Sequence, residues 1–161
     1  MRVAYADPPY IGLAWYYPDQ PSYAGEVDHV ELIRQLEADY DGFALSCSAR
    51  SLFTLLPLFS MQPEVCAWGK LLHPSVNTYG PHNTWEGLLV KPARRMRPGK
   101  PTFLCAAPAR RGGSTLIGRK PLAFCSWLFD LLGILPGDQF FDLFPGSGNV
   151  SNAWREFSRT S

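Results

Sequence analysis

Short apolar runs with the character of β-strands alternate along this chain with stretches that have the character of helices. Such alternation is typical of an α/β fold with a mostly parallel sheet, covered by helices on both faces, in which ligands bind beyond the carboxyl ends of the strands. With 161 residues, 46% of them hydrophobic and 18% charged, the chain can fill the core of one domain, which excludes a disordered protein. We expect strands at residues 3–6, 43–46, 65–68, 87–90 and 139–144, and helices at 28–39, 51–59, 121–133 and from the turn at 145–148 onward.

The sequence shows no sign of a membrane or metal protein. No apolar run approaches the roughly 20 residues of a membrane-spanning helix, and the N-terminus lacks the basic-then-apolar pattern of a signal peptide. The cysteines form no Cys-x-x-Cys pair, which predicts reduced, mostly buried thiols. We therefore expect a cytoplasmic protein that binds no metal and no membrane.

Positive charge is concentrated in one part of the chain. Residues 91–120 contain nine basic side chains and no acidic one, whereas the other 131 residues hold six basic and all fourteen acidic side chains. Prolines and glycines interrupt this basic block, which predicts a loop or short insertion that faces a polyanion, and we favour nucleic acid over an ordinary solvated loop. The residues expected to contact nucleic acid are Arg94, Arg95, Arg97, Lys100, Arg110 and Arg111.

The first motif, Asp7-Pro8-Pro9-Tyr10, follows the first predicted strand. The exocyclic amine of a nucleobase is a poor nucleophile because its lone pair is delocalised into the ring. A carboxylate and a backbone carbonyl, fixed side by side by two prolines, can accept both amine hydrogens and stabilise the developing positive charge. The aromatic ring of Tyr10 can stack on a base that has been rotated out of a helix. Alone, the motif is also compatible with a strand-ending turn in which Asp7 is a cap and Tyr10 is packed.

The second motif runs from Asp142 to Gly148 with the sequence DLFPGSG. A strand that enters a glycine-rich turn and then a helix lets a ligand approach the backbone and meet free amide groups. A dinucleotide-binding motif would have a third glycine where Ser151 stands. A plain tight turn between strand and helix is the alternative.

Together, the two segments resemble the amino-methyltransferases of DNA, whose catalytic motif matches ADPPY and whose S-adenosylmethionine-binding motif matches DLFPGSG. The order, catalytic motif first and cofactor motif last, resembles the beta-type permutation of that family, and residues 118–121 resemble the segment that precedes its glycine loop. The resemblance spans essentially the whole chain and implies a permuted, truncated Rossmann-like methyltransferase sheet. It divides the single domain into a catalytic half (1–90), a basic target-recognition loop (91–117) and a cofactor half (118–161).

The resemblance also implies roles for individual residues. Asp7 and the Pro8 carbonyl would hold the target amine, with Pro9 completing the motif, and Tyr10 would stack on the flipped base. A methyl group would pass directly from S-adenosylmethionine to the amine in DNA, and Asp rather than Ser before Pro-Pro-Tyr favours adenine N6 over cytosine N4. The residues implied for the cofactor site are Asp142, Phe144, Pro145, Gly146, Ser147, Gly148, Asn149 and Lys120.

Other functions stay open at this level. The same chemistry permits cytosine N4 or RNA as the substrate, and a non-catalytic nucleic-acid-binding relative is the alternative from another class. Protein glutamine methylation is disfavoured because its related motif carries Asn where this chain has Asp7.

The cofactor half departs from the family pattern, because no further strand supplies the acid that normally binds the cofactor ribose. Asp19, Glu86 or a partner chain could replace it, and the polar residues around Glu86 could line the cofactor or base pocket. The expected sheet has five strands with the apolar strand at 139–144 on an open edge. Exposed apolar edges invite pairing, so we expect a homodimer or another chain to cover the edge near Phe140 to Phe144.

Overall fold

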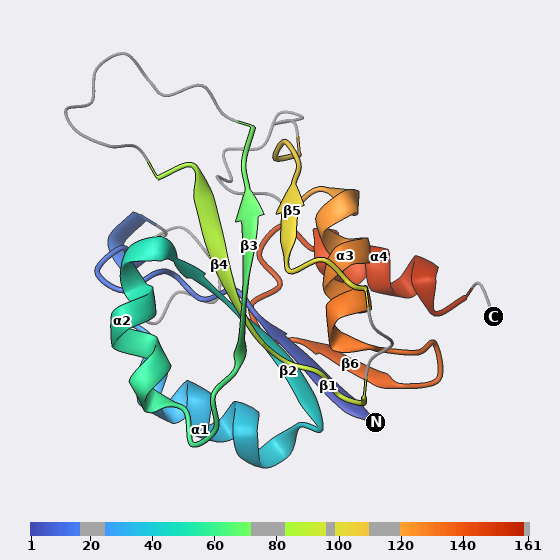
Figure 1. Ribbon diagram of the computed structural model, residues 1–161, viewed down its shortest axis with the longest axis horizontal. Coiled ribbons are helices and arrows are strands. Elements are labelled where there is room, and N and C mark those ends of the chain that lie inside the picture. The colour runs from blue at the N-terminus through green and yellow to red at the C-terminus, as the bar shows by residue number, and fades with distance from the viewer. Residues whose placement is uncertain (17–24, 72–82, 96–98, 110–119, 160–161) are drawn as a thin grey trace.

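The computed structural model describes residues 1–16, 25–71, 83–95, 99–109 and 120–159. Its centre is one six-stranded sheet in the order β5-β3-β4-β2-β1-β6 (Figure 1). The strands are β1 (Arg2–Ala6), β2 (Gly42–Ser48), β3 (Glu64–Gly69), β4 (Trp85–Lys91), β5 (Phe103–Cys105) and β6 (Gln139–Asp142). Because β4 pairs antiparallel with both β2 and β3 while all other pairs are parallel, β4 alone runs against the rest. The prediction of a mostly parallel α/β sheet is confirmed, and the reversal of β4 is a feature that it did not contain.

Helices cover both faces of this sheet (Figure 1). The helix α1 (His29–Asp39) begins at Asp28, whose side chain accepts hydrogen bonds from two backbone amides of the first turn. The helix α3 (Leu122–Leu132) ends at Gly133, whose φ of 63° closes it in the left-handed conformation. The helix expected at 51–59 is shorter: α2 (Leu52–Leu55) lies between 3-10 turns, and Pro57 falls in the second of them. The last helix is α4 (Asn149–Phe157).

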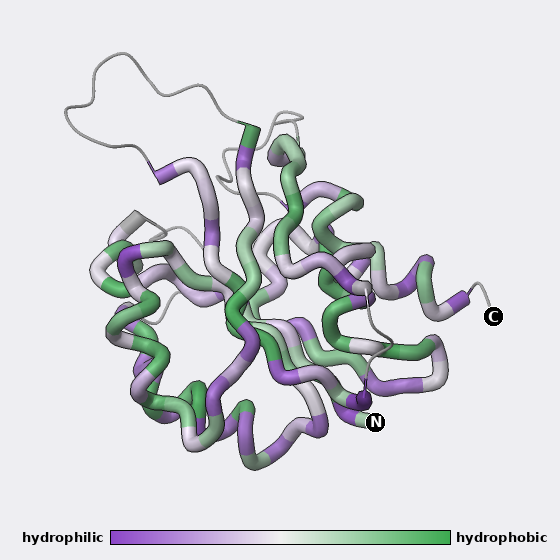
Figure 2. The backbone as a smooth tube through the Cα atoms, in the orientation of Figure 1, coloured by the Kyte–Doolittle hydropathy of each residue, from purple (hydrophilic) through white to green (hydrophobic). Residues whose placement is uncertain are grey.

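Two hydrophobic cores lie on opposite faces of the sheet, because side chains alternate along each strand. Val3 and Tyr5 of β1 belong to the core under α3 and α4, and Ala4 and Ala6 belong to the core under α1 and α2. Figure 2 shows hydrophobic segments along the central strands and along α3. Both faces of the sheet are therefore covered, which leaves the ends of its strands open to ligands.

The strand β6 lies at one edge of the sheet, as expected, and pairs with β1 alone among the described residues. Its apolar composition is explained by packing on the two faces. The ring of Phe140 lies 5.6 Å from that of Phe129 in α3, and the ring of Phe141 lies 5.4 Å from that of Tyr40 behind α1. Both phenylalanines are half-buried within the single chain. Cover by a second copy therefore stays a prediction.

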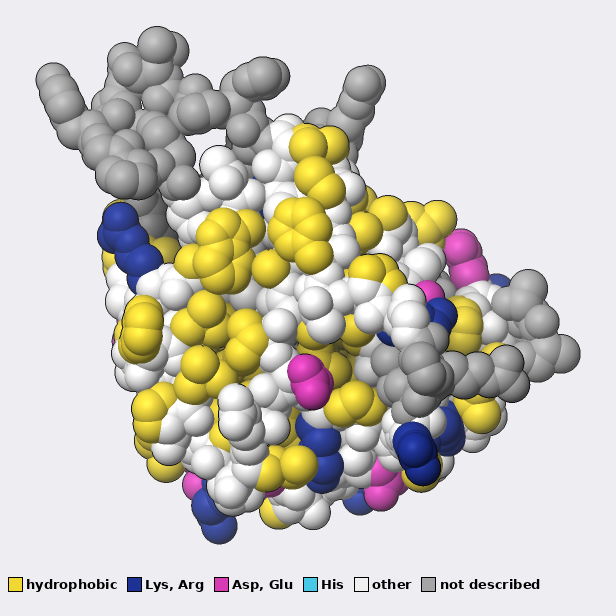
Figure 3. Space-filling view, viewed as in Figure 1, with side chains coloured by type: hydrophobic (Ala, Val, Ile, Leu, Met, Phe, Trp, Pro, Cys, Tyr) yellow, Lys and Arg dark blue, Asp and Glu magenta, His cyan; other side chains and the backbone are white. Residues whose placement is uncertain are grey.

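At the opposite edge, β5 is a strand that the sequence analysis did not expect. It lies inside the basic block, which we interpreted as a loop, and pairs parallel with β3. Trp127 Nε1 also donates a hydrogen bond to the carbonyl of Pro101 in this segment. Phe103 of this strand is 58% exposed, and Figure 3 shows hydrophobic side chains gathered at this edge.

Among the described residues, no helix is long and apolar enough to cross a membrane. Within the same ranges, no group of three or more metal-ligating side chains is found. Cys47, Cys66 and Cys125 are buried thiols, as predicted, while Cys105 is exposed.

Candidate active site

The residues of the first motif lie at the end of β1, the strand between β2 and the edge strand β6. The carboxyl ends of parallel strands meet at one edge, so Asp7 after β1 lies beside the end of β6, which carries Asp142. Because β4 runs the other way, its first residues reach this same edge and bring Glu86 there. The topology thus joins the two sequence motifs and adds an acid from a third strand.

A buried lysine joins Asp7, which follows β1, to Glu86 in β4. Lys120 precedes α3, is 5% exposed, and places its Nζ 2.9 Å from Asp7 Oδ2 and 3.0 Å from Glu86 Oε2. Lys70, directly after β3, forms a second ion pair with Glu86. The Lys120 ammonium also lies 5.4 Å from the ring centre of Trp68, which adds a cation–π contact. We call Asp7, Lys120, Glu86 and Lys70 the charge network.

Burial and charge act in opposite directions on these groups. Burial raises the pKa of Asp7, and the Lys120 ammonium opposes this rise. Burial also acts to raise the pKa of Glu86, but the two lysines outweigh it and lower this pKa overall. Burial acts to lower the pKa of Lys120, yet Asp7 and other anionic neighbours raise it well above its usual value. The network therefore holds Lys120 as a cation between two carboxyl groups.

Asp142 is the last residue of β6, the strand that leads into the glycine-rich turn. The Ser151 hydroxyl donates a 2.6 Å hydrogen bond to Asp142 Oδ2, whereas Oδ1 is buried and has no hydrogen-bond partner among the described residues. Burial raises the pKa of Asp142, the Ser151 hydrogen bond opposes this, and the charge of Asp7 adds to the rise. An unpartnered buried acceptor is costly, so Oδ1 is placed to accept a hydrogen bond from a ligand.

The turn itself depends on two glycines. Gly146 has a φ of 46° and Gly148 a φ of 73°, a region that other residues adopt only with strain. A Cβ at Gly146 would meet no atom closer than the Phe144 carbonyl oxygen at 3.9 Å. The left-handed backbone, rather than crowding, therefore demands glycine here. Pro145 accepts a 2.6 Å hydrogen bond from the amide of Gly148, and α4 begins at the next residue.

Lys120 was expected at the cofactor site, and that role stays a prediction. In the structure its ammonium pairs with Asp7 and Glu86. Its backbone carbonyl accepts a 3.0 Å hydrogen bond from Asn149 Nδ2 at the start of α4. Lys120 therefore links the glycine-rich turn to the first motif. Glu86 was named as a candidate for the missing ribose acid and for the pocket lining, and both roles stay predictions. Its ion pairs with Lys120 and Lys70 were not expected, because only the fold brings these charges together.

The remaining residues of the first motif are partly covered. Pro8 is buried, and Pro9 and Tyr10 are half-buried. The carbonyl of Tyr10 accepts a 2.8 Å hydrogen bond from the amide of Leu13, which turns the chain directly after the motif. Burial raises the pKa of the Tyr10 hydroxyl well above its usual value. The ring is therefore a neutral aromatic surface beside Asp7. Asp19, proposed as a replacement ribose ligand, lies outside the described residues.

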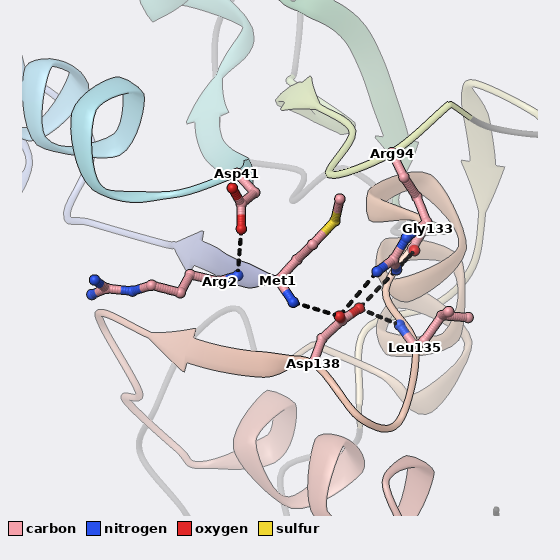
Figure 4. A network of polar contacts seen from close by, with 7 residues as sticks. All are labelled: Met1, Arg2, Asp41, Arg94, Gly133, Leu135 and Asp138. Atoms are coloured by element: carbon pink, nitrogen blue, oxygen red, sulfur yellow. Dashed lines mark hydrogen bonds and ion pairs between the residues drawn. The ribbon is translucent and has the colours of Figure 1, made fainter.

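The basic block divides into structural and exposed cations. Arg94 has a structural partner: its guanidinium donates hydrogen bonds to both Asp138 oxygens, at 2.7 and 2.9 Å, and to the Gly133 carbonyl (Figure 4). These bonds connect the segment after β4 to the end of α3, and contact of Arg94 with nucleic acid stays a prediction. Lys100 forms a 2.7 Å ion pair with Asp130. Arg95 is exposed, and Arg97, Arg110 and Arg111 lie outside the described residues.

Comparison with known proteins gives a result for the fold. No protein-family model and no curated protein matches the chain. Among solved structures, the complex of M1.HpyAVI with SAM matches at a TM-score of 0.63 and 16% identity, covering 98% of this chain and 78% of that one. A structure of M1.HpyAVI matches at 0.63 and 17%, covering 97% and 76%. The described six-stranded sheet with its helices has a Rossmann-like methyltransferase fold.

Proposed function

We propose that this protein transfers a methyl group from S-adenosylmethionine to an exocyclic amine of a base in DNA, with adenine N6 as the favoured acceptor. The observation that carries the proposal is the convergence of the two motifs. Asp7 follows β1, Asp142 ends the neighbouring β6, and both lie at the edge of the sheet where an α/β fold binds ligands. The likeness of the fold to M1.HpyAVI, of which one structure is a SAM complex, supports this proposal.

The residues at the glycine-rich turn fit the charged methionine part of such a cofactor. The orphaned Oδ1 of Asp142 is a buried acceptor suited to an ammonium group. The left-handed glycines at 146 and 148 leave the turn without side chains, so a ligand can approach its backbone. When bound, the cofactor would supply an electrophilic methyl group.

The catalytic motif would then act on the amine. The Asp7 carboxylate would accept one amine hydrogen and the Pro8 carbonyl the other, which localises the lone pair on nitrogen and stabilises the positive charge that develops there. Asp7 must be ionised for this role, and the Lys120 ammonium at 2.9 Å favours the ionised form. Tyr10, neutral and half-buried, would offer its ring to the extruded base.

Mass spectrometry of nucleosides tests the proposal. Unmodified DNA, and in parallel RNA, would be incubated with purified protein and methyl-labelled S-adenosylmethionine, then digested and analysed. We expect labelled N6-methyl-2'-deoxyadenosine from DNA with the wild type, none with Asp7→Ala, and wild-type yield with Asp39→Asn, which removes an exposed carboxylate at the end of α1.

Each other outcome has a defined meaning. Label on cytosine N4 would keep the reaction and change the base, and label in RNA alone would change the nucleic acid. Folded protein that binds nucleic acid but labels neither substrate would contradict the proposal and favour a non-catalytic binding relative.

A further inference from the structure

The carboxylate expected to hold the target amine is itself held by a buried cation. Lys120 Nζ lies 2.9 Å from Asp7 Oδ2, and Lys120 is 5% exposed whereas the Asp7 side chain is 25% exposed. Among the described residues, no other ion pair or hydrogen bond to the Asp7 carboxylate is found. One oxygen is therefore bound to Lys120, and Oδ1 is left for another donor.

We propose that Lys120 is a positioning residue for this site: it anchors Oδ2 of Asp7, places a positive charge against the carboxylate, and leaves Oδ1 to accept a hydrogen from the substrate amine. Glu86 holds Lys120 on its other side at 3.0 Å, and Lys70 in turn holds Glu86. The inference rests on the proposed function for the identity of the substrate, while the anchoring of Asp7 stands on the geometry alone.

The location of the charge network argues against a purely structural role. Burying ion pairs carries a desolvation penalty, so replacing them by apolar residues is often neutral or stabilising. Here the four charges come from four separate segments, namely the end of β1, the end of β3, the start of β4 and the residue before α3. One of the four is Asp7, the one acid of the catalytic motif, and the other three gather around it. Stability alone gives no reason for this placement.

Two substitutions should shift the pKa of the Asp7 carboxyl group in opposite directions. Removing the Lys120 charge leaves the Asp7 carboxyl group near Glu86 and Asp142 with less positive charge around it, so the carboxyl group should hold its proton more tightly. Removing the Glu86 charge takes away a like charge and leaves Lys120 to Asp7 alone, so the carboxyl group should release its proton more easily. The ionisable groups that face Asp7 are Lys120, Glu86, Lys70, Tyr5, Tyr10 and Asp142.

The direct test is a carbon-detected NMR titration of the Asp7 carboxyl group in the wild type, Lys120→Met, Glu86→Gln and the control Asp39→Asn. We expect Lys120→Met to raise the pKa of Asp7 by about 1–3 units, Glu86→Gln to lower it, and the control to leave it unchanged. A pKa that stays the same in both variants, or moves in the same direction, would overturn the proposal. Glu86→Gln keeps the shape of the side chain and one of the two oxygens that accept from Lys70 and Lys120, so it provides an independent test even if Lys120→Met fails to fold.

Single-turnover methyl transfer across pH gives the second readout. The acidic limb of the rate should move to higher pH in Lys120→Met by the same 1–3 units as the carboxyl group, and Lys120→Arg should restore it. If Lys120 were merely structural, Lys120→Met would lower stability and leave this limb in place, and that result would contradict the positioning role. If the wild type methylates no nucleic acid while the NMR shifts appear as expected, the proposed function fails and the anchoring of Asp7 stands.

Discussion

Replacing Asp138 by asparagine should destabilise the fold strongly, because this side chain connects three parts of the chain. It is 7% exposed and accepts hydrogen bonds from the Met1 amino group at 2.8 Å, from the Leu135 amide at 2.8 Å, and from two nitrogens of Arg94 at 2.7 and 2.9 Å (Figure 4). Hydrogen bonds to charged groups contribute about 1.5–3 kcal/mol each. Arg94 is 28% exposed and can return to water, so we expect a loss of about 2–4 kcal/mol in unfolding free energy.

The sign of the pH dependence follows from the hydrogen bonds that Arg94 donates, which hold the pKa of Asp138 well below its usual range. The contribution of Asp138 to the free energy of unfolding is complete above about pH 3.9, the pKa of an aspartate in the unfolded chain. It is lost as the pH falls through the lower pKa that Asp138 has in the folded protein. The difference between wild type and Asp138→Asn should therefore be largest near pH 7 and shrink below pH 4.

Urea denaturation at pH 7 and pH 3 measures both effects. The control is Glu31→Gln, which breaks an exposed ion pair with Arg34 within α1 and should change stability far less. A loss below about 1 kcal/mol at pH 7, or a difference that does not shrink in acid, would refute the reasoning. Arg94→Met should lose stability in the same direction while leaving the salt dependence of DNA binding unchanged, because its guanidinium is already paired.

Four further outcomes are expected. Asp7→Asn should reduce single-turnover methyl transfer by at least about 100-fold, while calorimetry finds S-adenosylmethionine affinity within about threefold of wild type. Gly148→Ala, at a φ of 73°, should cost about 1–2 kcal/mol in thermal or urea unfolding and weaken cofactor binding. DNA affinity should fall steeply with salt, and Arg95→Met should reduce the slope of log K against log salt by about 1, whereas a salt-independent affinity would contradict a role for the basic block. Light scattering should show a dimer that covers β6, and a stable, fully soluble monomer at low concentration would count against it.

Features that depend on neighbours in the chain could be predicted from the sequence. The strand before Asp7, the capped helix after Asp28, the helix end at Gly133 and the turn into α4 each follow from side-chain pattern, capping and glycine conformation within a few residues. The convergence of the two motifs was also predictable, because the ends of parallel strands share one edge of a sheet.

Features that depend on distant partners were decided only by the tertiary structure. The reversal of β4 brings Glu86 to the edge where Asp7 and Asp142 lie, and nothing in its local sequence indicates strand direction. The short strand β5 forms because β3 offers a partner. Arg94 counts as one more cation in a basic block until Asp138, 44 residues away, pairs with it. Lys120 likewise acquires its role from Asp7 and Glu86, since a charge is defined by the sequence but its neighbours are defined by the fold.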